Sequence, residues 1–313
     1  MHCQYLRHIE AKRPSAAEEI LAKKKRSPAP ESIDSSEETL FIYPFNSSIK
    51  SKSIAVRAED ASRLNDGEFL NDTLIEFGLK YVQANAEVRN AALAGQVYIF
   101  NTFFYQRLVA KPSKGQANSY EAIKNWTAKI DLFSMKYIIV PINENLHWHL
   151  AIITNPGLLL RRANESESDV SLELVDGSGI DEGKSPPANS IVIGSDNEPT
   201  KNPKMPFING SEKPYILCLN SLGGTHSAVF SVLRSYLQQV LLSRKGISMT
   251  LTSKEIAGKF SSKCPKQDNL SDCGVYLLHY AEVFLRNPET ILDAIVNRTD
   301  DKDLCGRHQR QIK

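Results

Sequence analysis

The sequence predicts a protein of the α/β or α+β class, in which helices and strands are interleaved along the chain. Three observations support this prediction. Short apolar runs typical of buried strands occur at residues 97–100, 136–142 and 150–153. Segments with apolar residues at helical spacing occur at residues 69–82, 227–242 and 273–285. A hydrophobic content of 41% and a charged content of 24% are ordinary for a globular protein.

Composition excludes several classes of protein. No run approaches about eighteen consecutive apolar residues, and Met1 is followed by polar sequence, so we expect neither a membrane span nor a secretory signal, but a soluble intracellular protein. The formal charge of +2 is too small for a chain that binds nucleic acid by neutralising phosphates. The five cysteines include no CxxC pair, which argues against a disulfide framework or a structural zinc site.

The two ends of the chain are polar and flank one expected domain. Residues 1–38 predict a disordered or weakly ordered basic and polar arm. The arm contains a basic run, Lys23 to Arg26, before Ser27 and Pro28, which is either a nuclear import signal or a solvated charged segment. The globular domain is expected over residues 39–298, and residues 299–313 form a polar tail.

Within the domain, each segment is assigned by its pattern. The apolar runs LFIYPF and SIAVR open it. Residues 69–82 predict a helix with one apolar face, formed by Leu70, Leu74, Phe77, Gly78 and Tyr81. Residues 155–213 are dominated by polar residues, Gly and Pro, and we interpret them as a polar insertion with at most one hairpin, around the strand-like SLELVDG.

The segment from residue 266 to 285 carries the first candidate catalytic residue. Its apolar spacing predicts a buried helix that begins at Cys273, is capped by Asp272 and ends before Pro288. The unpaired N–H groups at a helix start favour a thiolate, which makes Cys273 a candidate nucleophile. The alternative is a small core cysteine. The helix-start position, and Gly274 beside it as room for an approaching carbonyl, favour the catalytic interpretation.

A cysteine nucleophile needs a base, and His147 is the best candidate because it begins a strand after a polar loop. His149 is expected on the same side of that strand. The HxH pair resembles part of a metal site, but no Asp, Glu or Cys is spaced to complete it, so no metal is expected. His226, which opens a helix, and His279, inside the Cys273 helix, are expected to have capping, packing or surface roles.

Five sequence blocks occur in one order along the chain: GEFLNDTLIEFGLKYV, NTFFYQRL, IKNWTAKIDLFSMKYIIVPIN followed by HWHLAII, LNSLGGTHSAV, and CPKQDNLSDCGVYLL. Together they resemble the SUMO-specific cysteine proteases of the ubiquitin-like-protein-specific (Ulp/SENP) family. The form of the last block and the long insertion resemble the chain-editing branch more than the precursor-processing branch. The resemblance implies an α+β, papain-like cysteine protease fold with a central mixed sheet flanked by helices.

The resemblance also implies roles for individual residues. Cys273 becomes the nucleophile, His147 its general base, and Gln267 a donor to the oxygen anion formed when a carbonyl is attacked. The family has an Asp where this chain has Asn220, which can fix the imidazole tautomer but cannot offset the charge of an imidazolium. Three explanations stay open: a natural variant, a change made to trap substrate, or another carboxylate, for which Asp176 is the nearest candidate.

Substrate binding is inferred from the same resemblance. SUMO ends in Gly-Gly, and a narrow tunnel roofed by aromatic side chains can select such a tail. Trp148 matches one of those aromatics, and Phe69 stands where many relatives have Trp, although both could be ordinary core residues. Asn71, Asp72 and Gly274 complete the expected substrate-binding residues.

The expected activity is therefore a deSUMOylating isopeptidase that cleaves after Gly-Gly and trims SUMO chains. The reaction requires no metal or organic cofactor. We expect a monomer in the nucleus or in both nucleus and cytoplasm, with SUMO and SUMO conjugates as partners and neither nucleic acid nor membrane. Two alternatives stay open: a catalytically weakened SUMO-binding module, because of Asn220, and the same fold acting on another small modifier or in acyl transfer.

Overall fold

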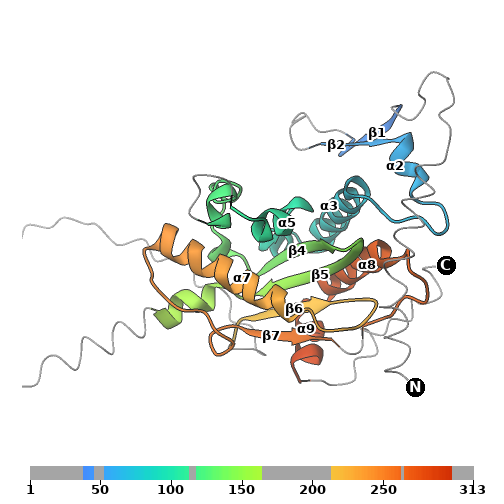
Figure 1. Ribbon diagram of the computed structural model, residues 1–313. Helices are drawn as coiled ribbons and strands as arrows, with labels where there is room; N and C mark the ends of the chain where they lie inside the picture. Colours follow the sequence, from blue (N-terminus) through green and yellow to red (C-terminus); the bar gives the residue numbers. More distant parts are fainter. Residues whose placement is uncertain (1–37, 46–52, 113–117, 164–212, 262–263, 298–313) are drawn as a thin grey trace, which may run out of the picture.

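A five-stranded mixed sheet forms the centre of the computed structural model (Figure 1). The structure describes residues 38–45, 53–112, 118–163, 213–261 and 264–297, and every structural statement concerns these residues. The strands of the sheet are β3 (Val97–Ile99), β4 (Tyr137–Glu144), β5 (His147–Thr154), β6 (Tyr215–Leu219) and β7 (Ala257–Phe260).

Helices flank this sheet, which confirms the predicted α+β class with a central mixed sheet. The α-helices are α2 (Ala58–Ser62), α3 (Asp72–Arg89), α4 (Ala91–Ala94), α5 (Phe103–Val109), α7 (Ser227–Val240), α8 (Cys273–Arg286) and α9 (Pro288–Asn297). Short 3₁₀ turns occur at Ser119–Ala122 and Leu132–Ser134, and a π-helical turn occurs at Leu241–Lys245.

The strands lie side by side in chain order, from β3 to β7. The outer pairs, β3 with β4 and β6 with β7, are parallel, whereas β4, β5 and β6 are antiparallel neighbours. All eight residues of β5 are buried, because helices cover both faces of the sheet. A strand buried on both faces has a nearly continuous apolar sequence, which explains why the runs at residues 136–142 and 150–153 were recognisable.

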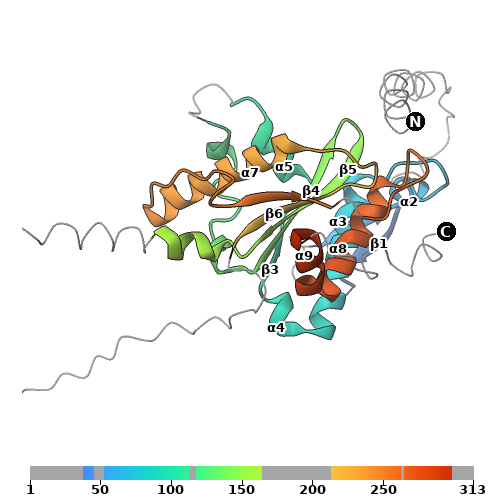
Figure 2. The same cartoon turned by 90° about the horizontal axis from the view of Figure 1, so that it is seen from below.

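Alternate side chains of each central strand enter two separate cores. Ile139 of β4 and Leu217 of β6 pack with α3, α8 and α9, whereas their neighbours Ile138 and Ile216 pack with α5 and α7. The side-chain period of two along a strand produces this division. Figure 2 shows the result: α5 and α7 lie on one side of the sheet, and α3, α8 and α9 on the other.

The buried face of α3 differs from the predicted face. The helix buries Leu74, Ile75, Leu79, Val82 and Ala86, whereas Tyr81 is 53% exposed. Phe77 and Tyr81 contact each other, and the Phe77 ring also packs against Tyr43, near the start of the domain. The predicted stripe was wrong in part, because Leu70 precedes the helix and Tyr81 is exposed, whereas Phe77 does pack against the core.

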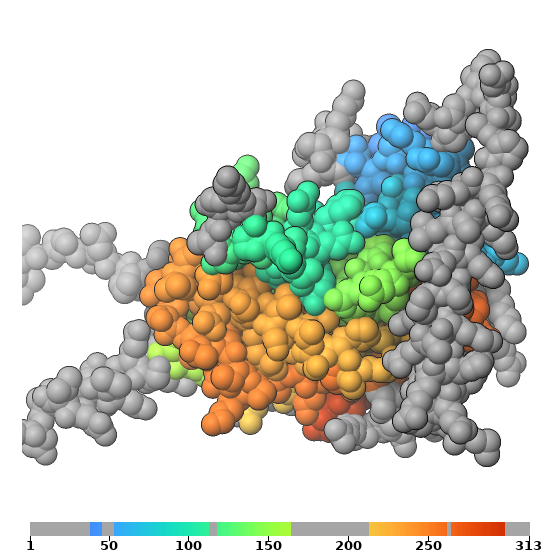
Figure 3. Space-filling model, in the orientation of Figure 1, coloured from blue at the N-terminus to red at the C-terminus, as the bar shows by residue number. Residues whose placement is uncertain are grey.

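The apolar runs LFIYPF and SIAVR form a separate two-stranded antiparallel pair of β1 (Thr39–Tyr43) and β2 (Ile54–Arg57). Phe41 and Tyr43 of β1 pack edge-on against Phe77 of α3. In the space-filling view of Figure 3, this pair (blue) lies at one end of the molecule, away from α7 (orange).

The polar insertion begins later than predicted. Residues 157–163 are helical, and Leu159 and Ala163 within them are buried. The first residues assigned to the insertion therefore belong to the packed domain. The strand-like SLELVDG with Asp176, the arm up to residue 37 and the tail from residue 298 lie outside the described residues. Among the described helices, none combines the length and apolarity needed to cross a bilayer.

Candidate active site

A tight hairpin between β4 and β5 places His147. The two loop residues, Asn145 and Leu146, have φ values of 53° and 63°. Two-residue hairpin turns of type I′ require positive φ values at both of these positions. The hairpin pairs His147 with Glu144 across the two strands. His147 is therefore the first residue of β5, as predicted, and its side chain is held on a rigid strand and buried.

The end of β6 brings Asn220 to the same place. Leu150 of β5 pairs with Leu219 of β6, so the next residue, Asn220, lies beside the start of β5. Its Oδ1 atom is 2.7 Å from Nε2 of His147, and both side chains are buried. The prediction that Asn220 contacts the candidate base is confirmed. Asp176, the alternative carboxylate, lies outside the described residues.

Backbone contacts fix which way the Asn220 amide faces. Its Oδ1 also accepts a hydrogen bond of 3.0 Å from the N–H of Leu222, and its Nδ2 donates one of 2.9 Å to the carbonyl of Gly223. Because Oδ1 only accepts, the hydrogen of the His147 ring must sit on Nε2. This tautomer leaves Nδ1 as the ring nitrogen that can take a proton.

Cys273 is the first residue of α8, as the apolar spacing predicted. Asp272 occupies the N-cap position, but its carboxylate makes no capping bond to the described helix backbone. It accepts hydrogen bonds from Asn269 and Ser271 instead. The expected capping by the Asp272 side chain is therefore wrong, because the preceding loop uses that carboxylate.

The ionisation of Cys273 also differs from the prediction of a favoured thiolate. Burial raises the pKa of the Cys273 thiol above its ordinary value, and the nearby Asp272 carboxylate raises it further. Hydrogen bonding from the backbone N–H groups of Trp148, Gly274 and Cys273 itself lowers the pKa, but does not reverse the shift. The contribution of the Trp148 N–H places the sulfur beside the residue that follows His147.

The aromatic candidates take part in the core. The Trp148 side chain is almost fully buried, and its indole N–H donates a hydrogen bond of 2.8 Å to the carbonyl of Leu70. Phe69 is partly buried and packs against the same core, on the α3 and α8 side. Trp148 thereby fixes the segment that carries Phe69 next to the start of β5.

Gly274 does not leave open space on its side-chain side. A Cβ atom there would lie 2.9 Å from Cβ of Leu70 and 3.1 Å from Cδ1 of Ile75. The expectation of room for a carbonyl at this position is wrong, because α8 packs closely on the segment before α3. Gly274 is needed for that close approach.

Asn71 and Asp72 lie at the start of α3. The Asn71 side chain caps this helix, accepting from the N–H of Leu74, and donates a hydrogen bond of 2.6 Å to the buried Asp60. One carboxylate oxygen of Asp72 is buried and has no hydrogen-bond partner among the described residues. Asn71 thus has a structural role, whereas Asp72 offers an acceptor.

Gln267 is anchored in the loop before α8. Its Oε1 accepts a hydrogen bond from the hydroxyl of Ser221, its backbone N–H donates to the carbonyl of Ser221, and its Nε2 donates to the carbonyl of Asn269. An amide nitrogen carries two hydrogens, so the bond to Asn269 uses one of them. Ser221 is the residue after Asn220, and so the same turn supports both His147 and Gln267.

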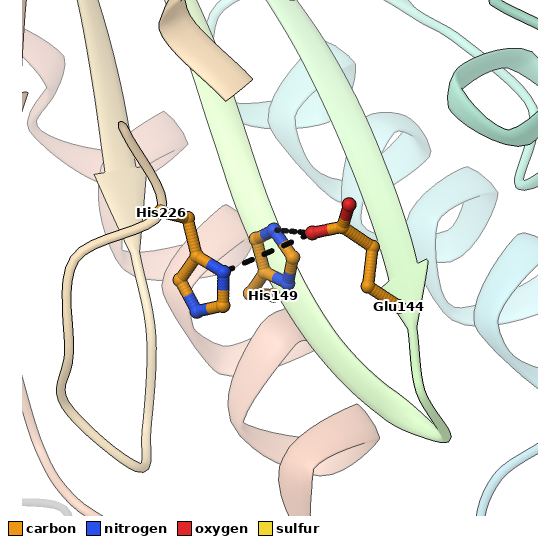
Figure 4. Close-up of side chains that lie close together, drawn as sticks. All are labelled: Glu144, His149 and His226. Atoms are coloured by element: carbon orange, nitrogen blue, oxygen red, sulfur yellow. Dashed lines mark ion pairs between the residues drawn. The ribbon is translucent and has the colours of Figure 1, made fainter. Parts of the chain in front are cut away.

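The structure also gathers a second group of side chains that sequence reasoning did not connect. His149 lies on the same side of β5 as His147, as predicted, with ring centroids 6.1 Å apart. His149, however, is joined by Glu144 and His226, whose ligand atoms all lie within 4.8 Å of one another (Figure 4). The expectation that no acid is placed to join His149 is wrong, because the hairpin and the turn after β6 bring Glu144 and His226 to it.

The sequence did not identify Ser221, Glu144 or His226 as site residues. Ser221 could have been noticed because it directly follows Asn220, and a hydroxyl at that position can hold a neighbouring side chain. Glu144 is only three residues before His147, and a hairpin pairs such positions. His226 gave no local signal, since its position follows from the turn between β6 and α7.

The chain is similar in sequence to known proteins. Residues 68–304 match the family described as the Ulp1 protease family, C-terminal catalytic domain. The chain is 39% identical, over 86% of its length, to Ubiquitin-like-specific protease 2 of Schizosaccharomyces pombe. It is 32% identical, over 75% of its length, to human Sentrin-specific protease 7. It spans 39% and 24% of the lengths of these two relatives.

A solved structure shares the fold. A crystal structure described as that of the de-sumoylating protease superposes with a TM-score of 0.58, over 87% of this chain and 82% of the other, at 24% identity. The likeness concerns the arrangement of helices and strands around the sheet.

Proposed function

The chain belongs to the Ulp1 protease family, whose profile spans most of its length, and from this we propose that it is a SUMO-specific isopeptidase. The proposal places it with Ubiquitin-like-specific protease 2 and Sentrin-specific protease 7, the relatives with which it shares 39% and 32% identity. Trimming of SUMO chains from lysine side chains is the activity that we assign. The observation that carries the proposal is the 2.7 Å contact between His147 and Asn220 beside Cys273.

In the proposed reaction, Cys273 is the nucleophile and His147 the general base. His147 takes the thiol proton on Nδ1, the nitrogen that the contact with Asn220 leaves available. Burial raises the pKa of the Cys273 thiol, so the proposed reaction needs His147 to remove this proton. Sulfur then forms a bond to the carbonyl carbon of the last glycine of SUMO, and the carbonyl oxygen becomes an anion.

Gln267 and the backbone N–H of Cys273 are assigned to this oxygen anion. A rigid donor is effective because it needs no rearrangement when the charge develops. The Ser221 hydroxyl and the Asn269 carbonyl hold the two ends of the Gln267 amide, which supports its assignment as a fixed donor. The second hydrogen on Nε2 is the one that we assign to the anion.

The remaining steps return the enzyme to its starting state. The carbon–nitrogen bond breaks, and His147 gives its proton to the departing lysine amine. Water then attacks the thioester while His147 removes a proton from it. The carbon–sulfur bond breaks, Cys273 recovers a proton from His147, and SUMO leaves with a free carboxylate. These steps use side chains of the protein and water.

For substrate binding, we assign the Gly-Gly tail to the region around Trp148, which is buried, and Phe69, which is partly buried. Both aromatics are held near the start of β5, Trp148 by its bond to Leu70 and Phe69 by packing on the core. Asp72, which is only partly buried, is assigned to contact the body of SUMO through its carboxylate. Asn71 and Gly274 act indirectly, by shaping the start of α3 and its contact with α8.

We expect the protein to be a monomer, with SUMO and SUMO conjugates as its partners. A nuclear or nucleocytoplasmic location stays a prediction, because the basic run from Lys23 to Arg26 lies outside the described residues.

A SUMO protein with an electrophilic C-terminus, together with lysine-linked SUMO dimers, tests the function. The protein should form a covalent adduct with the first and cleave the second, and Cys273→Ala should do neither. Labelling that survives Cys273→Ala would refute the assigned nucleophile. Equal reaction with a matched ubiquitin probe would refute the proposed SUMO specificity.

A second candidate function is a SUMO-binding module with weakened chemistry. Asn220 favours it, since a neutral amide orients His147 but does not compensate a positive ring. In that case the protein would bind SUMO conjugates without appreciable cleavage, and Asn220→Asp would restore turnover. Turnover of the unchanged protein comparable to that of Asn220→Asp would exclude this alternative.

A further inference from the structure

His149 is a buried imidazole that the proposed reaction does not use. It is 0% exposed, and among the described residues neither of its ring nitrogens has a hydrogen-bond partner. Buried polar groups are almost always hydrogen-bonded or serve another purpose, such as binding an ion. The unpartnered nitrogens of His149 therefore point to a ligand.

The atoms around His149 have the chemistry of a metal site. Oε2 of Glu144 lies 3.7 Å from Nε2 of His149 and 3.8 Å from Nδ1 of His226 (Figure 4). All three potential ligand atoms lie within 4.8 Å of one another. We propose that Glu144, His149 and His226 bind one divalent transition-metal ion of the zinc type. Two histidines, one glutamate and a water molecule are a common tetrahedral ligand set for zinc.

The separations between the potential ligand atoms are close to those of a zinc-bound site. Zinc bonds to imidazole nitrogen and carboxylate oxygen are about 2.0–2.2 Å long, which places tetrahedral ligand atoms roughly 3.3 Å apart. The observed separations from Glu144 exceed this by only a few tenths of an ångström. Glu144 and His226 are partly exposed, at 36% and 29% of their side chains, and so they provide both the entry path and the required movement.

His226 must turn for the ion to bind. Its ring is stacked on that of His149, with centroids 4.3 Å apart and planes within 17° of each other. The nitrogen lone pairs of parallel rings do not converge on one point, so at least one ring has to rotate. His149 is fixed in β5, whereas His226 precedes α7 at the end of a turn. The His226 ring is therefore the one that rotates.

This rotation connects the metal site to Asn220. Nε2 of His226 lies 2.7 Å from Nδ2 of Asn220, which donates to it. A neutral histidine bound to a metal through Nδ1 carries its hydrogen on Nε2, so two donors would then face each other. Binding of the ion therefore breaks this contact and loosens the Asn220 amide that orients His147. Metal binding should inhibit turnover, a consequence that rests on the proposed function.

The same argument predicts the effect of a carboxylate at residue 220. An aspartate accepts a hydrogen bond from His226 Nε2–H, and a carboxylate behind a metal-bound histidine strengthens metal binding. Asn220→Asp should accordingly bind the ion more tightly, by about 10- to 100-fold.

The binding test uses Zn²⁺ titration by calorimetry and Co²⁺ absorption spectroscopy on Cys273→Ala protein, which lacks the catalytic thiol as a competing ligand. We expect one ion per chain and at least about 10-fold weaker binding after Glu144→Gln. Glu282→Gln is the matched control, a glutamate of similar exposure that pairs with Arg286, and it should leave the affinity unchanged. Absence of stoichiometric binding, or equal affinity after Glu144→Gln, would overturn the site.

The coupling is tested on the active protein with SUMO dimers. Zn²⁺ should slow cleavage, and Glu144→Gln should make cleavage at least about 10-fold less sensitive to Zn²⁺. Equal inhibition of both proteins would place the inhibitory ion at Cys273 and overturn the coupling. If the protein cleaves no SUMO substrate, the proposed function fails, but the binding experiment still decides the metal site.

Discussion

His147 and Asn220 are joined by a hydrogen bond of 2.7 Å between the Nε2 atom of the ring and the Oδ1 atom of the amide. The N–H of Leu222 and the carbonyl of Gly223 hold the amide in this orientation. The contact thus provides the tautomer that a general base needs. It provides no negative charge to stabilise the imidazolium that forms when His147 takes a proton.

The first prediction concerns that missing charge. Asn220→Asp should raise kcat/KM for SUMO dimers by roughly 10- to 1000-fold at neutral pH, because a carboxylate beside the His147 ring stabilises the positive charge that develops on it in the proposed reaction. The gain is measured by steady-state cleavage. The carboxylate also loses the donor to Gly223, so thermal unfolding of the variant should accompany the kinetics.

Asn220→Ala is the matched control, since it removes the orienting oxygen without adding charge. It should lower kcat/KM below that of the unchanged protein. If Asn220→Ala retained full turnover, the orienting role of Asn220 would be wrong.

The second prediction concerns the support of Gln267 by Ser221. Gln267→Ala should reduce kcat by about 10²–10³-fold, the usual effect of losing one donor to an oxygen anion. Ser221→Ala should cause a smaller loss in kcat, with KM nearly unchanged, because Gln267 stays present but loses the partner of its Oε1. A change confined to KM in either variant would contradict the assignment.

The third prediction is a pH dependence. Alkylation by iodoacetamide requires the thiolate, and burial raises the pKa of Cys273 above the value of about 8.5 for a free cysteine. The alkylation rate of Cys273, followed by mass spectrometry, should therefore rise with pH through a midpoint above that of a free thiol. In Asn220→Asp, the midpoint should fall, since a charged His147 stabilises the thiolate. A midpoint near neutral pH in the unchanged protein would refute the prediction.

The fourth prediction tests the close packing of α8. Gly274→Ala should lower the free energy of unfolding by about 1–3 kcal/mol, the usual cost of overpacking, because its Cβ would come within 2.9 Å of Leu70. Denaturant unfolding measures the change. Gly95→Ala is the control: its Cβ would meet no atom closer than 3.5 Å, and its backbone is already helical. Equal stability of Gly274→Ala and Gly95→Ala would contradict this packing.

Much of the fold was predictable because burial leaves a pattern in sequence. The strands β4 and β5 were recognised as apolar runs, and α7 and α8 by their helical spacing. The face of α3 was predicted only in part, because periodicity does not show that Leu70 precedes the helix or that Tyr81 stays exposed beside Phe77. The helix at residues 157–163 was missed because it is short and lies next to polar sequence.

The sequence by itself predicted a nucleophile at Cys273 and a base at His147, since a helix start and a strand start are local features, and the resemblance to the family added Asn220 and Gln267. It also determined that residue 220 supplies no negative charge. Only the tertiary structure decided the ionisation of Cys273, the bond from Ser221 to Gln267, and the meeting of Glu144 and His226 around His149. These depend on burial and on contacts between segments distant in the chain, and a linear pattern records neither.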